Sequence, residues 1–274
     1  MDTNQLFSVK GYGAIVTGGA SGIGLACAEA LASGGARVTI LDMNAAAGER
    51  ESSRLRGLGW DVTSAMLDVT DRAAHDRAFD EAAQKCGRMD VIFANAGIDP
   101  GPGFMSFTDR SLRLPEHAIE NYEDARWHKV IGVSLDAVFH AIRAGARLMK
   151  PARSGSIVVT TSISAVRPAP GVGIAYMAAK AGAAQMVRTA ALELARYNVR
   201  VNAIAPGPFA TNIADGRMQD PKVQAAMARS VPLGRVASTD EVKGLALLLA
   251  SNASSFITGE QIVIDGGASL GAVD

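Results

Sequence analysis

Cysteine, net charge and long apolar runs are scarce in this chain of 274 residues. The two cysteines, Cys27 and Cys86, fall in stretches that we expect to be helical. We interpret them as core residues in a reducing compartment rather than as a disulfide framework. The 27 basic residues balance 27 acidic residues, which excludes the electrostatic footprint of a nucleic-acid-binding or membrane-surface protein. We therefore expect a small-molecule or protein partner.

Metal-ligand patterns and membrane segments are also lacking. The four histidines show no metal-ligand spacing with one another or with the cysteines, so we predict no metal site. The longest apolar runs are much shorter than a membrane span, and the first begins only about ten residues into the chain. We expect neither a membrane span nor a signal peptide, and we predict a soluble, cytoplasmic protein.

Short apolar runs alternate with longer stretches of helical periodicity. The runs near residues 15, 40, 92, 158, 202 and 263 are typical of buried strands, and a weaker strand is predicted near 65. Helical stretches are predicted at 22–33, 44–57, 71–86, 118–149 and 174–197. Strands flanked by helices of this length favour a doubly wound parallel sheet. Because no linker or repeat divides residues 1–274, we predict a single α/β domain.

A glycine-rich segment, TGGASGIG, joins the first predicted strand to the first helix. Gly18, Gly22 and Gly24 permit a tight turn and allow backbone N–H groups to approach a pyrophosphate, which a helix N-terminus favours electrostatically. Together with Ser21 and Ile23, these glycines are our candidate phosphate-binding turn.

A carboxylate ends the second predicted strand. Asp42 lies eighteen residues beyond Gly24, where it can accept hydrogen bonds from both hydroxyls of an adenosine ribose and would repel a 2′-phosphate. The segment that follows, MNAAAG, supplies no arginine to reverse this preference. The sequence therefore predicts NAD rather than NADP as the cofactor.

Three polar residues in 156–180 form a candidate catalytic group. Tyr176 and Lys180 are four residues apart in a predicted helix and therefore share one face, while Ser162 ends the preceding strand. Free tyrosine, with a pKa of about 10, is a poor base near neutral pH, but a nearby ammonium favours its ionised form. A serine hydroxyl can hold the reacting oxygen. We predict that this group moves the proton when a hydride passes between an alcohol carbon and a nicotinamide.

Motifs along the whole chain resemble those of the classical short-chain dehydrogenases/reductases. They are TGGASGIG, LDVT at 67–70, NAG at 95–97, YMAAK at 176–180, NAIAPGPFAT at 202–211 and FITGEQIVIDGG at 256–267, together with Asp42 and Ser162. The resemblance implies a Rossmann-type parallel sheet of about seven strands with helices on both faces. It also implies an NAD-preferring oxidoreductase of secondary alcohols and ketones, assembled as a homotetramer.

The resemblance implies further cofactor-binding residues. Those expected at the adenine are Asp68 and Val69, and those expected to support the cofactor beside the fourth strand are Asn95, Ala96 and Gly97. Those expected at the nicotinamide carboxamide are Pro206, Phe209 and Thr211. Tyr176 and Lys180 should also bind the nicotinamide ribose.

Two departures from the family pattern stand out. Ser134 occupies a helical position where the family commonly has an asparagine that maintains a water-linked proton path from the lysine. A serine that bonds to the preceding helical turn can also bend a helix, so we predict an active enzyme.

Residues 98–121 form an insertion that makes this segment about fifteen residues longer than usual, and we interpret it as an ordered loop at the substrate site or a subunit contact. Arg110 and Arg113 are its candidates for binding an acidic group, and 209–231 resembles a substrate lid.

Two other functions remain open. One is an acyl-carrier-type 3-ketoacyl reductase. Such an enzyme usually uses NADPH and has a basic surface for its acidic carrier. Asp42 argues against NADPH, and the zero net charge argues against a basic surface. The other is a catalytically impaired NAD-sensing protein, which Ser134 favours and the presence of Tyr176 and Lys180 disfavours.

Overall fold

A seven-stranded parallel sheet forms the centre of the computed structural model, which describes residues 2–99, 101, 103–106, 108, 109, 111–213 and 216–271. The strand order is β3-β2-β1-β4-β5-β6-β7. The strands are β1 (Gly13–Thr17), β2 (Arg37–Asp42), β3 (Val62–Met66), β4 (Val91–Ala94), β5 (Gly155–Thr160), β6 (Val199–Pro206) and β7 (Gln261–Ile264). The predicted strands and the doubly wound Rossmann-type fold are confirmed.

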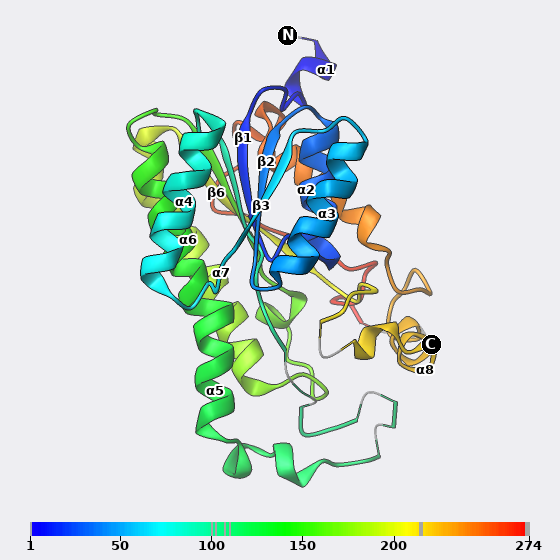
Figure 1. Ribbon diagram of the computed structural model, residues 1–274. Helices are drawn as coiled ribbons and strands as arrows, with labels where there is room; N and C mark the ends of the chain where they lie inside the picture. Colours follow the sequence, from blue (N-terminus) through cyan, green and yellow to red (C-terminus); the bar gives the residue numbers. More distant parts are fainter. Residues whose placement is uncertain are drawn as a thin grey trace.

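Helices cover both faces of the sheet (Figure 1). They are α1 (Thr3–Leu6), α2 (Gly22–Ser33), α3 (Ala45–Gly57), α4 (Arg72–Cys86), α5 (Asp124–Ile131), α6 (Ala137–Met149), α7 (Ile174–Leu194), α8 (Pro221–Ala228) and α9 (Lys243–Ala250). On one face α2 packs against α9 with α3 beside it, and on the other α6 packs against α4 and α7. Among the described helices, none is both long enough and apolar enough to cross a membrane.

Two apolar layers, one on each face, explain why the strands read as uninterrupted apolar runs. Neighbouring residues of a strand point to opposite faces, so Ile15 packs in the layer with Phe79 and Met149, whereas Val16 packs in the layer with Leu31. All five side chains are fully buried, and the remaining residues of β1 are buried as well. Burial on both faces is what a parallel sheet requires.

The helical stretch predicted at 118–149 is wrong in its first and middle parts. The regular helix α5 begins only at Asp124, after short 3₁₀ turns at Pro115–His117 and Ile119–Asn121. A π-helical turn, Gly132–Asp136, then separates α5 from α6. The interruption coincides with Ser134, whose side chain bonds to a loop outside the helix, a tertiary contact that helical periodicity does not report.

Because every strand is parallel, their carboxyl ends meet at one edge of the sheet. Strand order reverses between β1 and β4, which are neighbours although β2 and β3 separate them along the chain. Ligands of doubly wound folds bind at the carboxyl edge beside such a reversal. The predicted site residues lie at or just beyond the carboxyl ends of β1 to β6, or on the helices that follow.

Candidate active site

The glycine-rich turn after β1 has the geometry of a cradle. Gly18 and Gly22 adopt left-handed backbone conformations, with φ of 62° and 55°. A Cβ on Gly24 would lie 2.2 Å from the carbonyl oxygen of Gly18 and 2.4 Å from Nδ2 of Asn95, so no larger residue fits there. The turn is therefore built so that its backbone, rather than side chains, faces a ligand.

The start of α2 supports the same interpretation. Ser21 is its N-cap residue with an extended backbone, but its side chain makes no capping hydrogen bond, and the first turn carries no acidic residue. Ile23 packs against the core and anchors this turn. Thr211, from the segment after β6, lies close by, with its Cβ 3.5 Å from the position of a Cβ on Gly22. A helix start without a side-chain cap can bind an anion through its backbone N–H groups.

Asp42 ends β2 beside this turn. Its Oδ2 accepts a hydrogen bond from the backbone N–H of Ala20 at 3.0 Å, and its Oδ1 accepts one from the N–H of Asn44 at 2.9 Å. Each carboxylate oxygen keeps a second lone pair for a further donor. The carboxylate is thus fixed in place and still able to bind hydroxyl groups.

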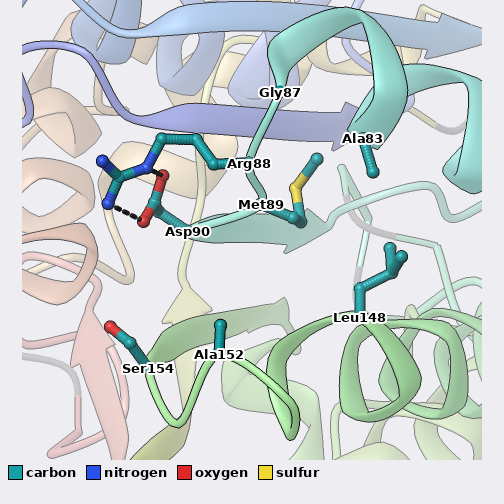
Figure 2. Close-up of a pocket in the computed structure, with 8 residues that line it drawn as sticks. All are labelled: Ala83, Gly87, Arg88, Met89, Asp90, Leu148, Ala152 and Ser154. Atoms are coloured by element: carbon teal, nitrogen blue, oxygen red, sulfur yellow. Dashed lines mark hydrogen bonds and ion pairs between the residues drawn. The ribbon is translucent and has the colours of Figure 1, made fainter.

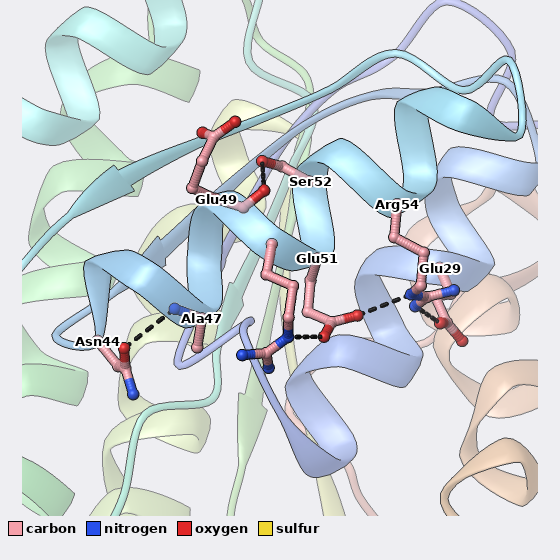
Figure 3. Close-up of polar contacts among 8 residues, drawn as sticks. Glu29, Asn44, Ala47, Glu49, Glu51, Ser52 and Arg54 are labelled. Carbon is pink, nitrogen blue, oxygen red and sulfur yellow. Dashed lines mark hydrogen bonds and ion pairs between the residues drawn. The ribbon is translucent and has the colours of Figure 1, made fainter.

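Helix α3 begins at Ala45, shortly after Asp42. Figure 3 shows the polar contacts that anchor this helix. Asn44 caps it by accepting a hydrogen bond from the N–H of Ala47 at 3.0 Å. Further along, Arg54 pairs with Glu51 at 2.7 Å and with Glu29 of α2. Exposed pairs of this kind contribute at most about 1 kcal/mol each, so we interpret them as orienting α3 against α2 rather than as a major source of stability.

Asn95 braces the carboxyl edge from within. Its Nδ2 donates to the carbonyl oxygens of Thr17 and Gly18, both at 3.2 Å, and its Oδ1 accepts from Oγ1 of Thr160 at 3.0 Å. These bonds join the ends of β1, β4 and β5. Gly18 also lies close to Ala96, because a Cβ on Gly18 would be 2.9 Å from the Ala96 Cα. Asn95 therefore supports the glycine turn from behind.

Lys180 and Ser134 meet at Gly97. A Cβ on Gly97 would lie 3.2 Å from Nζ of Lys180 and 3.6 Å from Oγ of Ser134, so a larger residue there would crowd the lysine ammonium and contact the serine hydroxyl. The Ser134 hydroxyl accepts from the N–H of Ile98 at 3.1 Å and donates to its carbonyl oxygen at 3.2 Å. The hydroxyl therefore donates to the loop after β4 and not to the preceding helical turn, the bond by which a serine can bend a helix. It fastens this loop to a helix that does carry a local distortion.

The three predicted catalytic residues are all buried at this edge. Tyr176 and Lys180 lie on α7, with the lysine Nζ 5.5 Å from the tyrosine ring centroid. Nζ of Lys180 donates to the carbonyl oxygen of Thr160 at 2.7 Å, and burial lowers the lysine pKa to about 8. Burial raises the pKa of Tyr176, the charge of Asp99 adds to the rise, and a hydrogen bond from Ser162 opposes it.

The remaining predicted cofactor residues lie at the same edge of the sheet, after β3 and β6. Oδ1 of Asp68 accepts from the N–H and hydroxyl of Thr70, at 2.9 Å and 2.7 Å, and Val69 is buried beside it. Pro206 is the last residue of β6, and Phe209 is buried where it forms a bridge with Ala237. The structure therefore brings all the predicted segments to one edge of the sheet.

The 98–121 insertion packs on the loop before α7. The N–H of Gly103 donates to the carbonyl oxygen of Gly171 at 2.8 Å, and the N–H of Met105 donates to that of Pro170 at 3.2 Å. Arg113 lies over the exposed ring of Phe104 at 5.7 Å, so its guanidinium has a partner within the insertion. Arg110, the other arginine predicted to bind an acidic group, lies outside the described residues.

Comparisons with known proteins identify the family. The family model described as enoyl-(acyl carrier protein) reductase matches residues 18–269. Cis-4-hydroxycyclohexanecarboxylate dehydrogenase of Sinomonas cyclohexanicum is 39% identical over 256 residues, which cover 93% of this chain and 95% of that protein. The chain belongs to the short-chain dehydrogenase/reductase family.

Two further relatives of this short-chain dehydrogenase/reductase are named for different activities. A 3-oxoacyl-[acyl-carrier-protein] reductase of Chlamydia muridarum is 36% identical over 255 residues, covering 93% of this chain and 96% of its own. The solved structure of a gluconate 5-dehydrogenase from Burkholderia cenocepacia, in complex with NADP and tartrate, is 30% identical with a TM-score of 0.87. That match covers 99% of this chain and 100% of the solved chain. The protein is an oxidoreductase that acts on CH–OH groups with a nicotinamide cofactor.

Several residues of this short-chain dehydrogenase/reductase site have no signal in the sequence pattern. Thr160 receives the Lys180 hydrogen bond and braces Asn95, yet it is one residue of an apolar strand. Asp99 and Tyr122 lie near Tyr176 although they belong to the insertion and the segment after it. Only the position of Asp99 directly after NAGI, at the end of a strand, could have singled it out.

A cavity in this short-chain dehydrogenase/reductase lies at the opposite, amino edge of the sheet (Figure 2). Its volume is about 470 Å³, and its lining includes the ion pair in which Arg88 binds both oxygens of Asp90 at 2.6 Å and 2.7 Å. Oδ2 of Asp90 also accepts from the N–H of Gly13 at 2.8 Å. None of the predicted catalytic or cofactor residues lines this cavity, and its charged pair is already satisfied.

Proposed function

We propose that this protein is an NAD(H)-dependent oxidoreductase that interconverts a secondary alcohol and a ketone, with Tyr176 as general acid and base. The observation that carries the proposal is the convergence of Tyr176, Lys180 and Ser162 at the edge that also holds the glycine turn and Asp42. This arrangement supplies a proton carrier, a cation and a hydroxyl beside a phosphate cradle.

The described residues fit a dinucleotide. A Cβ on Gly24 would clash with the backbone of the glycine turn, the start of α2 has no side-chain cap, and Asp42 retains free lone pairs at the end of β2. The Asp42 carboxylate supports a preference for NAD, because it would repel a 2′-phosphate. When bound, the nicotinamide supplies the hydride acceptor or donor.

The chain's own residues move the proton. In alcohol oxidation the ionised hydroxyl of Tyr176 accepts the proton of the substrate hydroxyl, and in ketone reduction the protonated form returns it. Ser162 holds the substrate oxygen beside the phenol. Lys180, with a pKa of about 8, is mostly protonated at neutral pH, and its charge favours the ionised phenol. Burial and Asp99 act in the opposite direction, so we expect oxidation to accelerate as the pH rises towards the pKa of Tyr176.

The 3-oxoacyl-[acyl-carrier-protein] reductase relative favours an acyl-carrier-type 3-ketoacyl reductase as a second candidate. That enzyme would reduce a ketone on an acidic carrier protein, and the zero net charge of this chain offers such a carrier no basic surface overall. The gluconate 5-dehydrogenase solved with NADP likewise raises NADP as the competing cofactor. Asp42 is the residue that discriminates between the two cofactors in this chain.

A cofactor and substrate screen tests the proposal. Purified protein is assayed with NAD⁺ and with NADP⁺ against secondary alcohols that include polyols, sugar acids and cyclic alcohols, and with 3-ketoacyl thioesters for the reverse reaction. We expect turnover with NAD⁺ and an alcohol, and Asp42→Ala should improve the use of NADP⁺ relative to NAD⁺. Turnover with NADP⁺ alone would refute the Asp42 argument, and a fully active Tyr176→Phe variant would refute the proton-transfer assignment.

The wider organisation is part of the same proposal. We interpret residues 1–274 as one domain, with 98–121 bordering the substrate and 209–231, including α8, acting as a lid. Exposed apolar side chains support a homotetramer: Phe139 on α6, Leu192 on α7, and Phe256 and Leu270 near the C-terminus. Analytical ultracentrifugation measures the assembly directly.

We also propose a cytoplasmic location, for which the buried free thiols of Cys27 and Cys86 are suited.

A further inference from the structure

A buried carboxylate lies at the start of the helix that carries Tyr176. Asp99 is only 9% exposed, and its Oδ1 lies 3.5 Å from the position that a Cβ on Gly173 would occupy. The Tyr122 hydroxyl lies 3.6 Å from the same point. Gly173 is the N-cap residue of α7, three residues before Tyr176. The Asp99 carboxylate is therefore fixed at the N-terminal end of this helix.

The surroundings of Asp99 explain why a carboxylate is stable there. The N-cap residue of α7, Gly173, has no side chain with which to cap the helix, and the first turn has no acidic residue of its own, so a negative charge beside it is favoured by the helix dipole. Oδ1 of Asp99 accepts a hydrogen bond from the N–H of Gly101 at 3.4 Å. Nη2 of Arg126 lies 4.0 Å from the Cβ position on Gly173, which brings a cation to the same pocket.

We propose that Asp99 is a positioning residue of the reaction, whose buried negative charge at the start of α7 sets the pH range in which Tyr176 accepts the proton of an alcohol substrate. This inference rests on the proposed role of Tyr176. It gives the 98–121 insertion a direct effect on the chemistry, because Asp99 is one of its first residues.

The groups that face Tyr176 act on it in opposite directions. On its own helix, Lys180 places Nζ 5.5 Å from the ring centroid, and from the segment after β5 the Ser162 hydroxyl reaches it. Both favour the ionised phenol. From the insertion, Asp99 opposes ionisation, and it raises the pKa of Tyr176 together with burial, which is the larger cause.

The groups behind Asp99 form a second layer. Burial raises the pKa of Tyr122, Arg126 lowers it and Asp99 raises it, so the same carboxylate acts on both phenols. Arg126 lies over the Tyr122 ring at 4.9 Å, and its Nη1 is 2.7 Å from Nδ1 of His117. The cation therefore has several contacts of its own around Asp99.

The test compares the full chain with its Asp99→Asn variant in the presence of saturating NAD⁺. Ultraviolet absorbance of tyrosinate, recorded as the difference from the matching Tyr176→Phe background, follows ionisation of Tyr176 without any substrate. We expect Asp99→Asn to titrate at a pH lower by about one unit, as removal of a nearby like charge predicts. The kcat/KM for an alcohol found in the screen should rise about tenfold on the low-pH side of its profile.

Matched variants separate charge from structure. Asp99→Glu keeps the charge and should retain the wild-type titration, and Glu116→Gln, which removes an exposed carboxylate from the same insertion, should leave it unchanged. If Asp99→Asn does not fold, as thermal unfolding would reveal, Asp99→Ser removes the charge with a smaller side chain. An unshifted Tyr176 titration in the folded neutral variant overturns the inference. An active Tyr176→Phe enzyme instead overturns the proposed function, and the two failures are distinguishable.

Discussion

His75 offers a quantitative test of the packing between α4 and α6. Its side chain is fully buried, its ring stacks on Phe79 with centroids 4.3 Å apart, and the ring of His140 lies 5.7 Å away. Neither ring nitrogen has a hydrogen-bond partner among the described residues. Burial lowers the pKa of His75 from 6.5 to about 4, because charging the imidazole there is costly.

The sign of the effect on stability follows from proton binding. Between pH 6.5 and about pH 4 the unfolded chain protonates His75 while the folded chain does not, so the free energy of unfolding falls as the pH drops through this interval. At about 1.36 kcal/mol per pH unit, the interval corresponds to about 3 kcal/mol. The charges of His140 and Arg143 also lower the pKa, and Asp76 raises it. Above pH 6.5 the contribution to stability is complete.

Urea unfolding across this pH interval, for the wild type and for His75→Leu, measures the effect. The variant removes the titrating group, so its free energy of unfolding should fall by about 3 kcal/mol less than that of the wild type on acidification. His128→Leu, which removes an exposed histidine from α5, should behave like the wild type. Identical pH dependence in His75→Leu and the wild type would show that His75 is not buried in its neutral form.

Three further predictions concern the site. Gly24→Ala should abolish NAD binding measured by calorimetry, because its Cβ would lie 2.2 Å from the Gly18 carbonyl oxygen. Gly244→Ala, whose Cβ meets no atom within 4 Å, should bind NAD normally, and equal binding by both variants would argue against the cradle. Lys180→Met should lower kcat by about a hundredfold or more and remove the kinetic pKa expected near 8, an outcome that unchanged kinetics would contradict. Ser134→Ala loses both hydrogen bonds to the loop after β4 and should cost about 1–3 kcal/mol in urea unfolding; no loss would mean that these bonds do not hold the loop.

Local patterns were enough to predict the main parts of the site. Tyr176 and Lys180 share a helical face because of their spacing, and Ser162 and Asp42 follow from where apolar strands end. The glycine turn could also be predicted from the sequence, because closely spaced glycines directly after a strand are typical of a tight turn. What these side chains contact could not be predicted in the same way.

The hydrogen bonds and the helix distortion that the sequence pattern did not predict arise from contacts between segments far apart in the chain. Asn95 fastens the glycine turn and Thr160 to one another, joining segments more than sixty residues apart. Ser134 bonds to Ile98 rather than to its own helix, and the helix is distorted at that point. Such bonds depend on where strands and helices are placed by the whole sheet, which hydrophobic periodicity does not record.

The sequence by itself determined the order of strands and helices and the doubly wound parallel class, and it predicted which residues form the candidate catalytic group, because each depends on local periodicity or on the chemistry of a short motif. The tertiary structure alone decided the strand order, the late start of α5 and the burial of Asp99 beside the Tyr176 helix. These features arise when segments far apart in the chain exclude water together. The balance of charges around Tyr176 is therefore a property of the folded protein rather than of any one motif.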